Sequence, residues 1–138
     1  MEKKCFVIMP YGSSEVDQRE YSRIYRYFIK QASDDLGLAC VRSDIEGRGG
    51  HILGNVIEDL ANADIVVADI SALNWNVAYE LGIRHVLSKK GTILICSSMH
   101  KAALPFDIQS LNILFYPQNW LDSVDELCDA LKKQSKAA

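Results

Sequence analysis

The sequence predicts an α/β protein of the flavodoxin-like type, a three-layer sandwich around a five-stranded parallel sheet with the strand order 2-1-3-4-5. Short apolar runs alternate with helical patterns along the chain, which is typical of a parallel sheet covered by helices on both faces. Right-handed crossovers between neighbouring strands favour this order. The chain has 138 residues, of which 49% are hydrophobic. We therefore expect residues 1–138 to form a single domain with one core.

Each predicted element follows from local signals. The first strand, residues 5–9, is apolar and stops at Pro10. The first helix, about 19–36, carries apolar residues at helical spacing and ends at Gly37. The other predicted elements are a strand at 38–41, a helix at 51–61, a strand at 64–69, a helix at 75–88, strands at 92–96 and 113–116, and a last helix at about 121–133.

Composition narrows the classes of function. The net charge is −3, which argues against binding to a nucleic-acid polymer or an anionic membrane surface. No run approaches the roughly 20 apolar residues of a membrane span, and the start does not resemble a signal peptide. The four cysteines are widely spaced and form no metal-binding motif. We expect a cytoplasmic protein without a bound metal or cofactor.

The most informative segment is 69–82, which follows an apolar strand. Asp69 ends that strand, and a polar loop with Ser71 and Asn74 leads to Asn76 and Glu80 on the next helix. Ligands of open α/β sheets bind at the carboxyl ends of the strands. A lone Glu on an apolar helix should be desolvated, which raises a carboxyl pKa and is typical of functional sites. The segment therefore predicts a small-molecule site centred on Glu80.

The helix at 75–88 leaves two questions open. Glu80 could instead form an ion pair with Arg84, four residues further on. The helix is also apolar nearly all round, which predicts burial by the sheet on one side and by a partner subunit on the other.

Two further loops end at the same edge of the sheet. After the first strand, Tyr11 and Gly12 belong either to a plain turn or to a turn that lines the substrate. After the second strand, Arg42 precedes Gly49 and Gly50, and this loop is either a plain surface loop or a cradle for phosphate at the start of a helix. The basic stripe of the first helix is interpreted as its solvated face. That stripe consists of Arg19, Arg23, Arg26 and Lys30.

Several segments together resemble a known superfamily. Val66-Val-Ala-Asp-Ile70 followed by Asn76-Val-Ala-Tyr-Glu-Leu-Gly82 resembles the nucleoside 2-deoxyribosyltransferase-like proteins, which include the 2′-deoxynucleoside 5′-phosphate N-hydrolases and lie close to TIR domains. A bacterial TIR-like branch is similar in three further segments. These are Cys5-Phe-Val-Ile-Met-Pro-Tyr-Gly12, Arg42-Ser-Asp44 and Leu104-Pro-Phe-Asp107.

The resemblance implies specific roles. Glu80 matches the catalytic carboxylate that attacks the anomeric carbon or stabilises the cationic sugar, and Asp69 matches the residue that orients the sugar or assists the base. Tyr11 matches an aromatic residue of the site. The resemblance adds Asp44 to the expected substrate-binding residues, and it implies a homodimer or higher homo-oligomer. The expected substrate-binding set is Tyr11, Gly12, Arg42, Asp44, Gly49, Gly50, Ser71, Asn74 and Asn76.

One position departs from the deoxyribosyltransferase pattern. These enzymes resemble each other in an Asp six residues before the nucleophile, where this chain has Asn74. An amide cannot act as a general acid, although the cationic nicotinamide of NAD leaves without one. We therefore expect an N-glycosidase that cleaves the base–ribose bond of NAD or a nucleoside 5′-monophosphate. The alternatives are a non-catalytic TIR-like assembly module and a nucleotide sensor.

Overall fold

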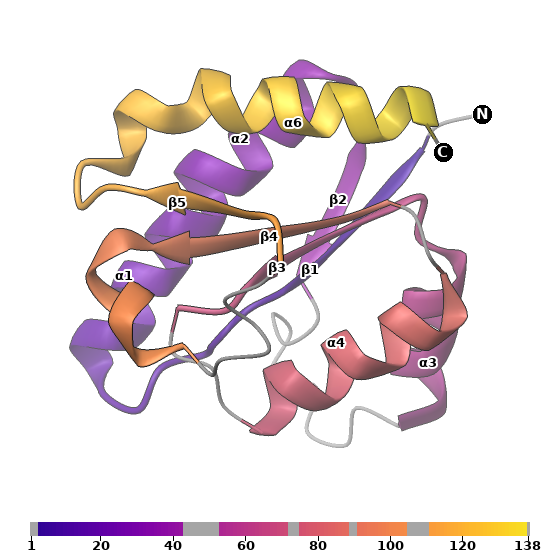
Figure 1. The fold of residues 1–138 in the computed structure, drawn as a ribbon, viewed down its shortest axis with the longest axis horizontal. Helices are drawn as coiled ribbons and strands as arrows, with labels where there is room; N and C mark the ends of the chain where they lie inside the picture. The colour runs from indigo at the N-terminus through magenta and orange to yellow at the C-terminus, as the bar shows by residue number, and fades with distance from the viewer. Residues whose placement is uncertain (1–2, 43–52, 72–74, 89–90, 105–110, 138) are drawn as a thin grey trace.

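Five parallel strands form the centre of the fold (Figure 1). The structure is a computed structural model that describes residues 3–42, 53–71, 75–88, 91–104 and 111–137. The strand order is β2-β1-β3-β4-β5, which confirms the predicted flavodoxin-like fold. The strands are β1 (Lys4–Ile8), β2 (Ala39–Arg42), β3 (Ile65–Asp69), β4 (Thr92–Ser97) and β5 (Ile113–Tyr116).

Helices cover both faces of the sheet (Figure 1). One layer contains α1 (Glu15–Ile24), a π-helical turn (Tyr25–Ile29), α2 (Lys30–Asp35) and α6 (Val124–Ala137). The other layer contains α3 (Leu53–Asn62) and α4 (Trp75–Leu87). Short 3₁₀ helices follow β4 (Ser98–Ala103) and β5 (Trp120–Ser123). Among the described residues, no helix is long and apolar enough to span a membrane.

The two sides of the sheet carry separate halves of the core. Along β3, Ile65 and Val67 belong to the cluster under α1, α2 and α6. Val66 and Ala68 belong to the cluster under α3 and α4. Successive side chains of a strand point to opposite faces, and all of β3 is buried. The continuous apolar run that predicted this strand is therefore explained by burial on both sides.

The first helix begins earlier than the pattern predicts. Its start is at Glu15 rather than near Arg19, because the Ser14 hydroxyl accepts a hydrogen bond of 3.2 Å from the Asp17 amide. Acidic residues in the first turn also suit the positive end of the helix dipole. Apolar spacing does not predict this start, because the first turn is mostly polar.

Arg84 joins α4 to the end of α3. Its side chain is buried, and its Nη1 donates to the carbonyl oxygens of Leu60 at 2.6 Å and Ala63 at 2.9 Å. Burial lowers the pKa of Arg84, and Asp64 acts in the opposite direction. Gly91 lies against the same corner with a φ of +79°, and a Cβ there would collide with the Asp64 carbonyl. The amino-terminal end of the sheet is thus built around a buried guanidinium.

Candidate functional site

A buried carboxylate network lies at the carboxyl end of β3. Asp69 is fully buried. Its Oδ1 accepts hydrogen bonds from the amide of Ser71 at 2.9 Å and from the Ser71 hydroxyl at 2.5 Å. Its Oδ2 accepts one of 2.6 Å from the Tyr116 hydroxyl. Burial raises the pKa of Asp69, and the hydrogen bonds from Ser71 and Tyr116 partly offset this rise.

The same network ties together the ends of three strands. The Ser71 hydroxyl lies 3.0 Å from the Tyr116 hydroxyl and accepts a 2.7 Å hydrogen bond from the amide of Ser97. These residues stand just beyond β3 and at the ends of β5 and β4. Burial and the charge of Asp69 raise the pKa of Tyr116, so its hydroxyl keeps its proton and remains a donor. The polar groups at this edge of the sheet are therefore held in fixed positions.

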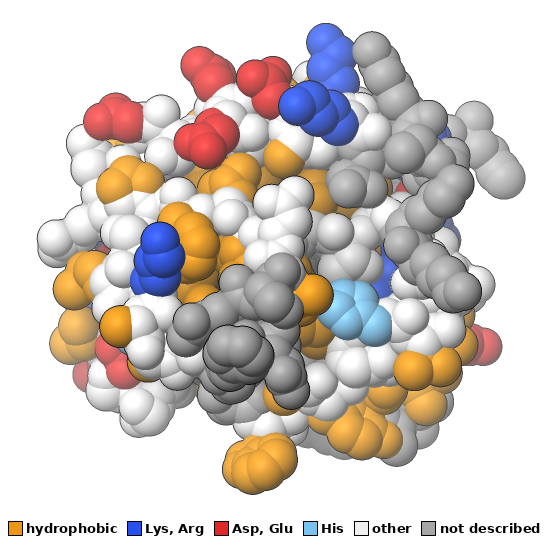
Figure 2. Space-filling view, viewed as in Figure 1, with side chains coloured by type: hydrophobic (Ala, Val, Ile, Leu, Met, Phe, Trp, Pro, Cys, Tyr) orange, Lys and Arg blue, Asp and Glu red, His pale blue; other side chains and the backbone are white. Residues whose placement is uncertain are grey.

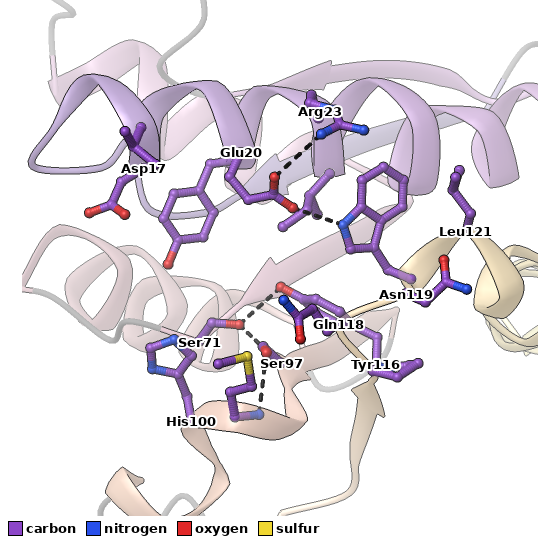
Figure 3. A pocket seen from close by; sticks show the side chains of 16 residues that line it. Asp17, Glu20, Arg23, Ser71, Ser97, His100, Tyr116, Gln118, Asn119 and Leu121 are labelled. Atoms are coloured by element: carbon purple, nitrogen blue, oxygen red, sulfur yellow. Dashed lines mark hydrogen bonds and ion pairs between the residues drawn. The ribbon is translucent and has the colours of Figure 1, made fainter.

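A cavity of about 670 Å³ lies over this network, between α1 and the segments that follow β4 and β5 (Figure 3). We call it the α1–β5 crevice. Its size is that of a small-molecule site. Since Ser71, Ser97 and Tyr116 stand at the ends of β3, β4 and β5, the crevice lies at the carboxyl edge of the sheet, where ligands of such folds usually bind. Its lining includes Asp17, Glu20, Tyr21, Arg23, Ser71, Ser97, Met99, His100, Tyr116, Gln118, Asn119 and Trp120.

The crevice combines carboxylates with aromatic rings. Glu20 Oε1 accepts a 3.0 Å hydrogen bond from the indole of Trp120, and Glu20 Oε2 lies 3.7 Å from Arg23 (Figure 3). Burial, followed by the charges of Asp69 and Asp17, raises the pKa of Tyr21 to about 12. The crevice thus places carboxylate and hydroxyl groups next to aromatic side chains.

Two predicted site residues meet at this crevice. Ser71 lines it, and Asp69 lies behind Ser71 and Tyr116. These two hydroxyls hold the carboxylate of Asp69, which has no exposed surface of its own. The catalytic part of Asp69 and the binding part of Ser71 stay predictions.

Tyr11 and Arg42 also come together. The guanidinium carbon of Arg42 lies 5.9 Å from the centre of the Tyr11 ring. Arg42 is 4% exposed and donates a 2.8 Å hydrogen bond from Nη2 to the Pro10 carbonyl, so it positions the loop that carries Tyr11. Gly12, with a φ of +106°, packs against the first turn of α1, where a Cβ would collide with the Gln18 amide. The loop is therefore a turn with Tyr11 exposed within it, and the part of this turn in lining a substrate stays a prediction.

A second groove of about 430 Å³ runs beside Tyr11. Arg19, Arg23 and Arg26 line it together with Tyr11. The three arginines of the predicted basic stripe are exposed and Lys30 is half-buried. With Glu15 as the one acidic residue of the described lining, the arginines give this groove a net positive charge. Arg23 lines both the groove and the crevice, so the two are adjacent.

Glu80 is half-buried on α4, beside the buried Val77 and Leu81. It is not among the described residues that line the α1–β5 crevice. Arg84 is 1% exposed and bound to carbonyl oxygens, which rules out an exposed surface pair with Glu80. Asn76 is exposed in the first turn of the same helix. Asp44, Gly49, Gly50 and Asn74 lie outside the described residues.

The sequence interpretation missed much of the crevice. The predicted site residues come from the loops after the first three strands, whereas Tyr116 and Trp120 come from the end of the fifth strand and the segment beyond it. The predicted strand order already places β5 beside β4, so this signal was available. Asp17, Glu20 and Tyr21 share one helix face by their spacing of three and four residues. Within the described residues, no group of three His, Cys, Asp or Glu side chains is placed to hold a metal ion.

Neither a known protein family nor a curated protein sequence matches this chain.

Proposed function

We propose that the protein cleaves the N-glycosidic bond of a nucleotide, either NAD or a nucleoside 5′-monophosphate, with Glu80 as the catalytic carboxylate. The observation that carries the proposal is the α1–β5 crevice, which offers carboxylates, hydroxyls and aromatic rings at the carboxyl edge of the sheet. Glu80 is half-buried on the helix that follows β3 and does not line this crevice, so its catalytic role rests on the sequence resemblance.

In this mechanism Glu80 attacks the anomeric carbon or stabilises an oxocarbenium-like transition state. The electrons of the carbon–nitrogen bond leave with the base. Nicotinamide leaves NAD as a neutral molecule, whereas the base of a nucleoside monophosphate takes a proton from solvent as it departs. Water then adds to the anomeric carbon and gives up a proton, which releases the phosphorylated sugar. Asn74 or Asn76 holds the sugar hydroxyls. Asp69 positions Ser71 and Tyr116, which is the role open to a carboxylate with no exposed surface.

The remaining groups bind the two ends of the nucleotide. Tyr11 stacks on the sugar or base, because its ring is exposed and backed by Arg42. The 47–50 loop with Arg42 takes the phosphate. The three arginines of the neighbouring groove support a phosphate on this side of the site, because guanidinium groups form strong hydrogen bonds with phosphate oxygens.

A chromatographic assay tests the proposal. Wild-type protein is incubated with NAD and with each deoxynucleoside monophosphate, and free nicotinamide or free base is measured. Glu80→Gln should lower the rate by about 10³-fold or more, since an amide is neither nucleophile nor anion. Glu126→Gln, an exposed change on α6, is the matched control and should keep the wild-type rate. A Glu80→Gln protein as active as wild type would refute the assignment.

A non-catalytic module is the second candidate, and the exposed apolar side chains of α4 favour it. These are Trp75, Tyr79 and Val86. If wild-type protein releases base from no nucleotide and associates with itself, the assembly module is supported. Calorimetry that shows tight binding of an intact nucleotide would identify a sensor.

A further inference from the structure

The outward face of α4 is apolar. Trp75, Tyr79 and Val86 are 91%, 55% and 85% exposed, while Val77 and Leu81 on the inward face are buried. Figure 2 shows hydrophobic side chains along the lower edge of the molecule, where Figure 1 draws α4. Large apolar groups of this exposure on one helix mark an interaction surface.

This face also lacks formal charge. None of the exposed residues of α4 is Asp, Glu, Lys or Arg; they are Trp75, Asn76, Ala78, Tyr79, Gly82, His85, Val86 and Leu87. By contrast, the exposed residues of α1 include Glu15, Asp17, Arg19 and Arg23. A partner of high charge has nothing to pair with among these exposed residues, so the face fits another uncharged, apolar surface.

Gly82 is a second and independent observation. It lies in the middle of α4 and is exposed, and a Cβ at this position would meet nothing within 4 Å. The fold of one chain therefore has no need of glycine here, although glycine weakens a helix interior relative to alanine. A close approach by the backbone or a large side chain of another chain would explain why this position has no Cβ.

The spacing of these residues indicates that the other chain is a second copy of this protein. Trp75, Tyr79, Gly82 and Val86 are separated by four, three and four residues, the spacing of a coiled-coil seam. When two copies of α4 lie antiparallel around a two-fold axis between residues 80 and 81, Trp75 faces Val86 of the second copy. Tyr79 then faces Gly82 of the second copy. Each large ring meets a smaller residue, so the stripe is complementary to itself.

We propose that α4 is a homodimer interface in which two copies of this helix pack antiparallel in that register. The contact is isologous, as in two-fold symmetric dimers. The helix has 13 residues and is about 20 Å long. One helix face is smaller than the roughly 800 Å² per partner of a standard interface, so we expect a concentration-dependent dimer with a dissociation constant on the order of micromolar.

Sedimentation velocity over a range of concentrations tests the surface. Val86→Arg should raise the dissociation constant at least about tenfold, because it buries a charge that has no partner. Val16→Arg is the matched control, since Val16 is 77% exposed on α1, and it should dimerise like wild type. A wild-type protein that stays monomeric overturns the proposal. Equal effects of the two variants overturn it as well.

Gly82→Ala tests the close approach, because it should stabilise the helix and weaken the dimer. Alanine should raise the Tm of the dilute protein by about 2–5 °C through better helix propensity. It should also raise the dissociation constant about tenfold, because its methyl group meets Tyr79 of the second copy. A stabilised helix with unchanged dimerisation would refute the register.

Cysteine cross-linking tests the direction of the helices. Trp75→Cys mixed with Val86→Cys should form a disulfide between the two variants under mild oxidation. Trp75→Cys alone should not link to itself, since the two sites would lie about 16 Å apart along the axis. Self-linking without mixed linking would show parallel helices. Glu80→Gln should dimerise like wild type, so that the failure of this proposal and of the proposed activity can be told apart.

Discussion

Asp69 is a carboxylate that the fold holds without contact to solvent. Its neighbours Ser71 and Tyr116 satisfy its oxygens, and both hydroxyls line the crevice. Their positions are fixed by hydrogen bonds rather than by packing alone. An acid buried in this way also links the stability of the protein to pH.

The contribution of Asp69 to the free energy of unfolding should fall as the pH rises above 3.8, the ordinary pKa of this carboxyl. Because burial raises the pKa in the folded protein, the folded state holds the proton more tightly than the unfolded chain does. The stabilisation is complete below 3.8 and is lost as the pH rises through the raised folded pKa. Asp69→Asn has no such proton to lose.

Urea unfolding at a series of pH values, from about 3.5 to 8, measures this difference. The stability of wild type relative to Asp69→Asn should decline over that window and then become constant. A difference that rises with pH would mean that the hydrogen bonds from Ser71 and Tyr116 outweigh burial.

The sequence predicts Asp69 and Ser71 at the same place because they are neighbours at a strand end. It does not predict Tyr116 as their partner, since that contact joins residues 47 positions apart. Such a contact depends on the register of β4 and β5, where Ser97 pairs with Tyr116. Register is set by packing rather than by a local signal.

At the scale of elements, all five strands and the order of the sheet were predictable. The apolar runs are buried on both faces, and right-handed crossovers leave few alternative orders. The π-helical turn at Tyr25–Ile29 was not predictable, because its residues fit an α-helical pattern equally well. The crevice was missed for a similar reason, since its polar residues come from separate elements that meet only in the folded chain.

The close packing of Gly91 against Asp64 and Arg84 predicts that a substitution at Gly91 destabilises the fold. Gly91→Ala should lower the free energy of unfolding by about 2–4 kcal/mol, because it combines an unfavourable positive φ with a collision against the Asp64 carbonyl. Gly37 has a similar φ of +70° but open space around it, so Gly37→Ala should cost only about 1 kcal/mol. Urea denaturation compares the two variants, and equal losses would show that Gly91 matters only through its φ.

At the scale of the whole molecule, the two candidate surfaces lie on different layers. The crevice is formed by the layer of α1 and the ends of β3, β4 and β5, whereas the apolar face belongs to α4 in the other layer. Glu80 lies on α4 itself, so the proposed catalytic carboxylate and the proposed dimer contact share one helix.

Binding to the native state should stabilise the whole fold. A nucleoside monophosphate at about 100 times its dissociation constant should raise the free energy of unfolding of Glu80→Gln by about 2.7 kcal/mol. This variant is chosen because it should bind without consuming the ligand. Differential scanning fluorimetry detects the effect as a higher Tm, and ribose without a phosphate is the control. No rise with any nucleotide would contradict a nucleotide site in this protein.

The chain contains two tryptophans, and their surroundings are opposite. Trp120 is 5% exposed in the wall of the crevice, bonded to Glu20, while Trp75 is 91% exposed on α4. The molecule therefore has two natural optical reporters. In Trp75→Phe, the remaining emission comes from the crevice and responds to a ligand there. In Trp120→Phe, it comes from α4, and a shift to shorter wavelength with rising protein concentration reports the burial of that helix.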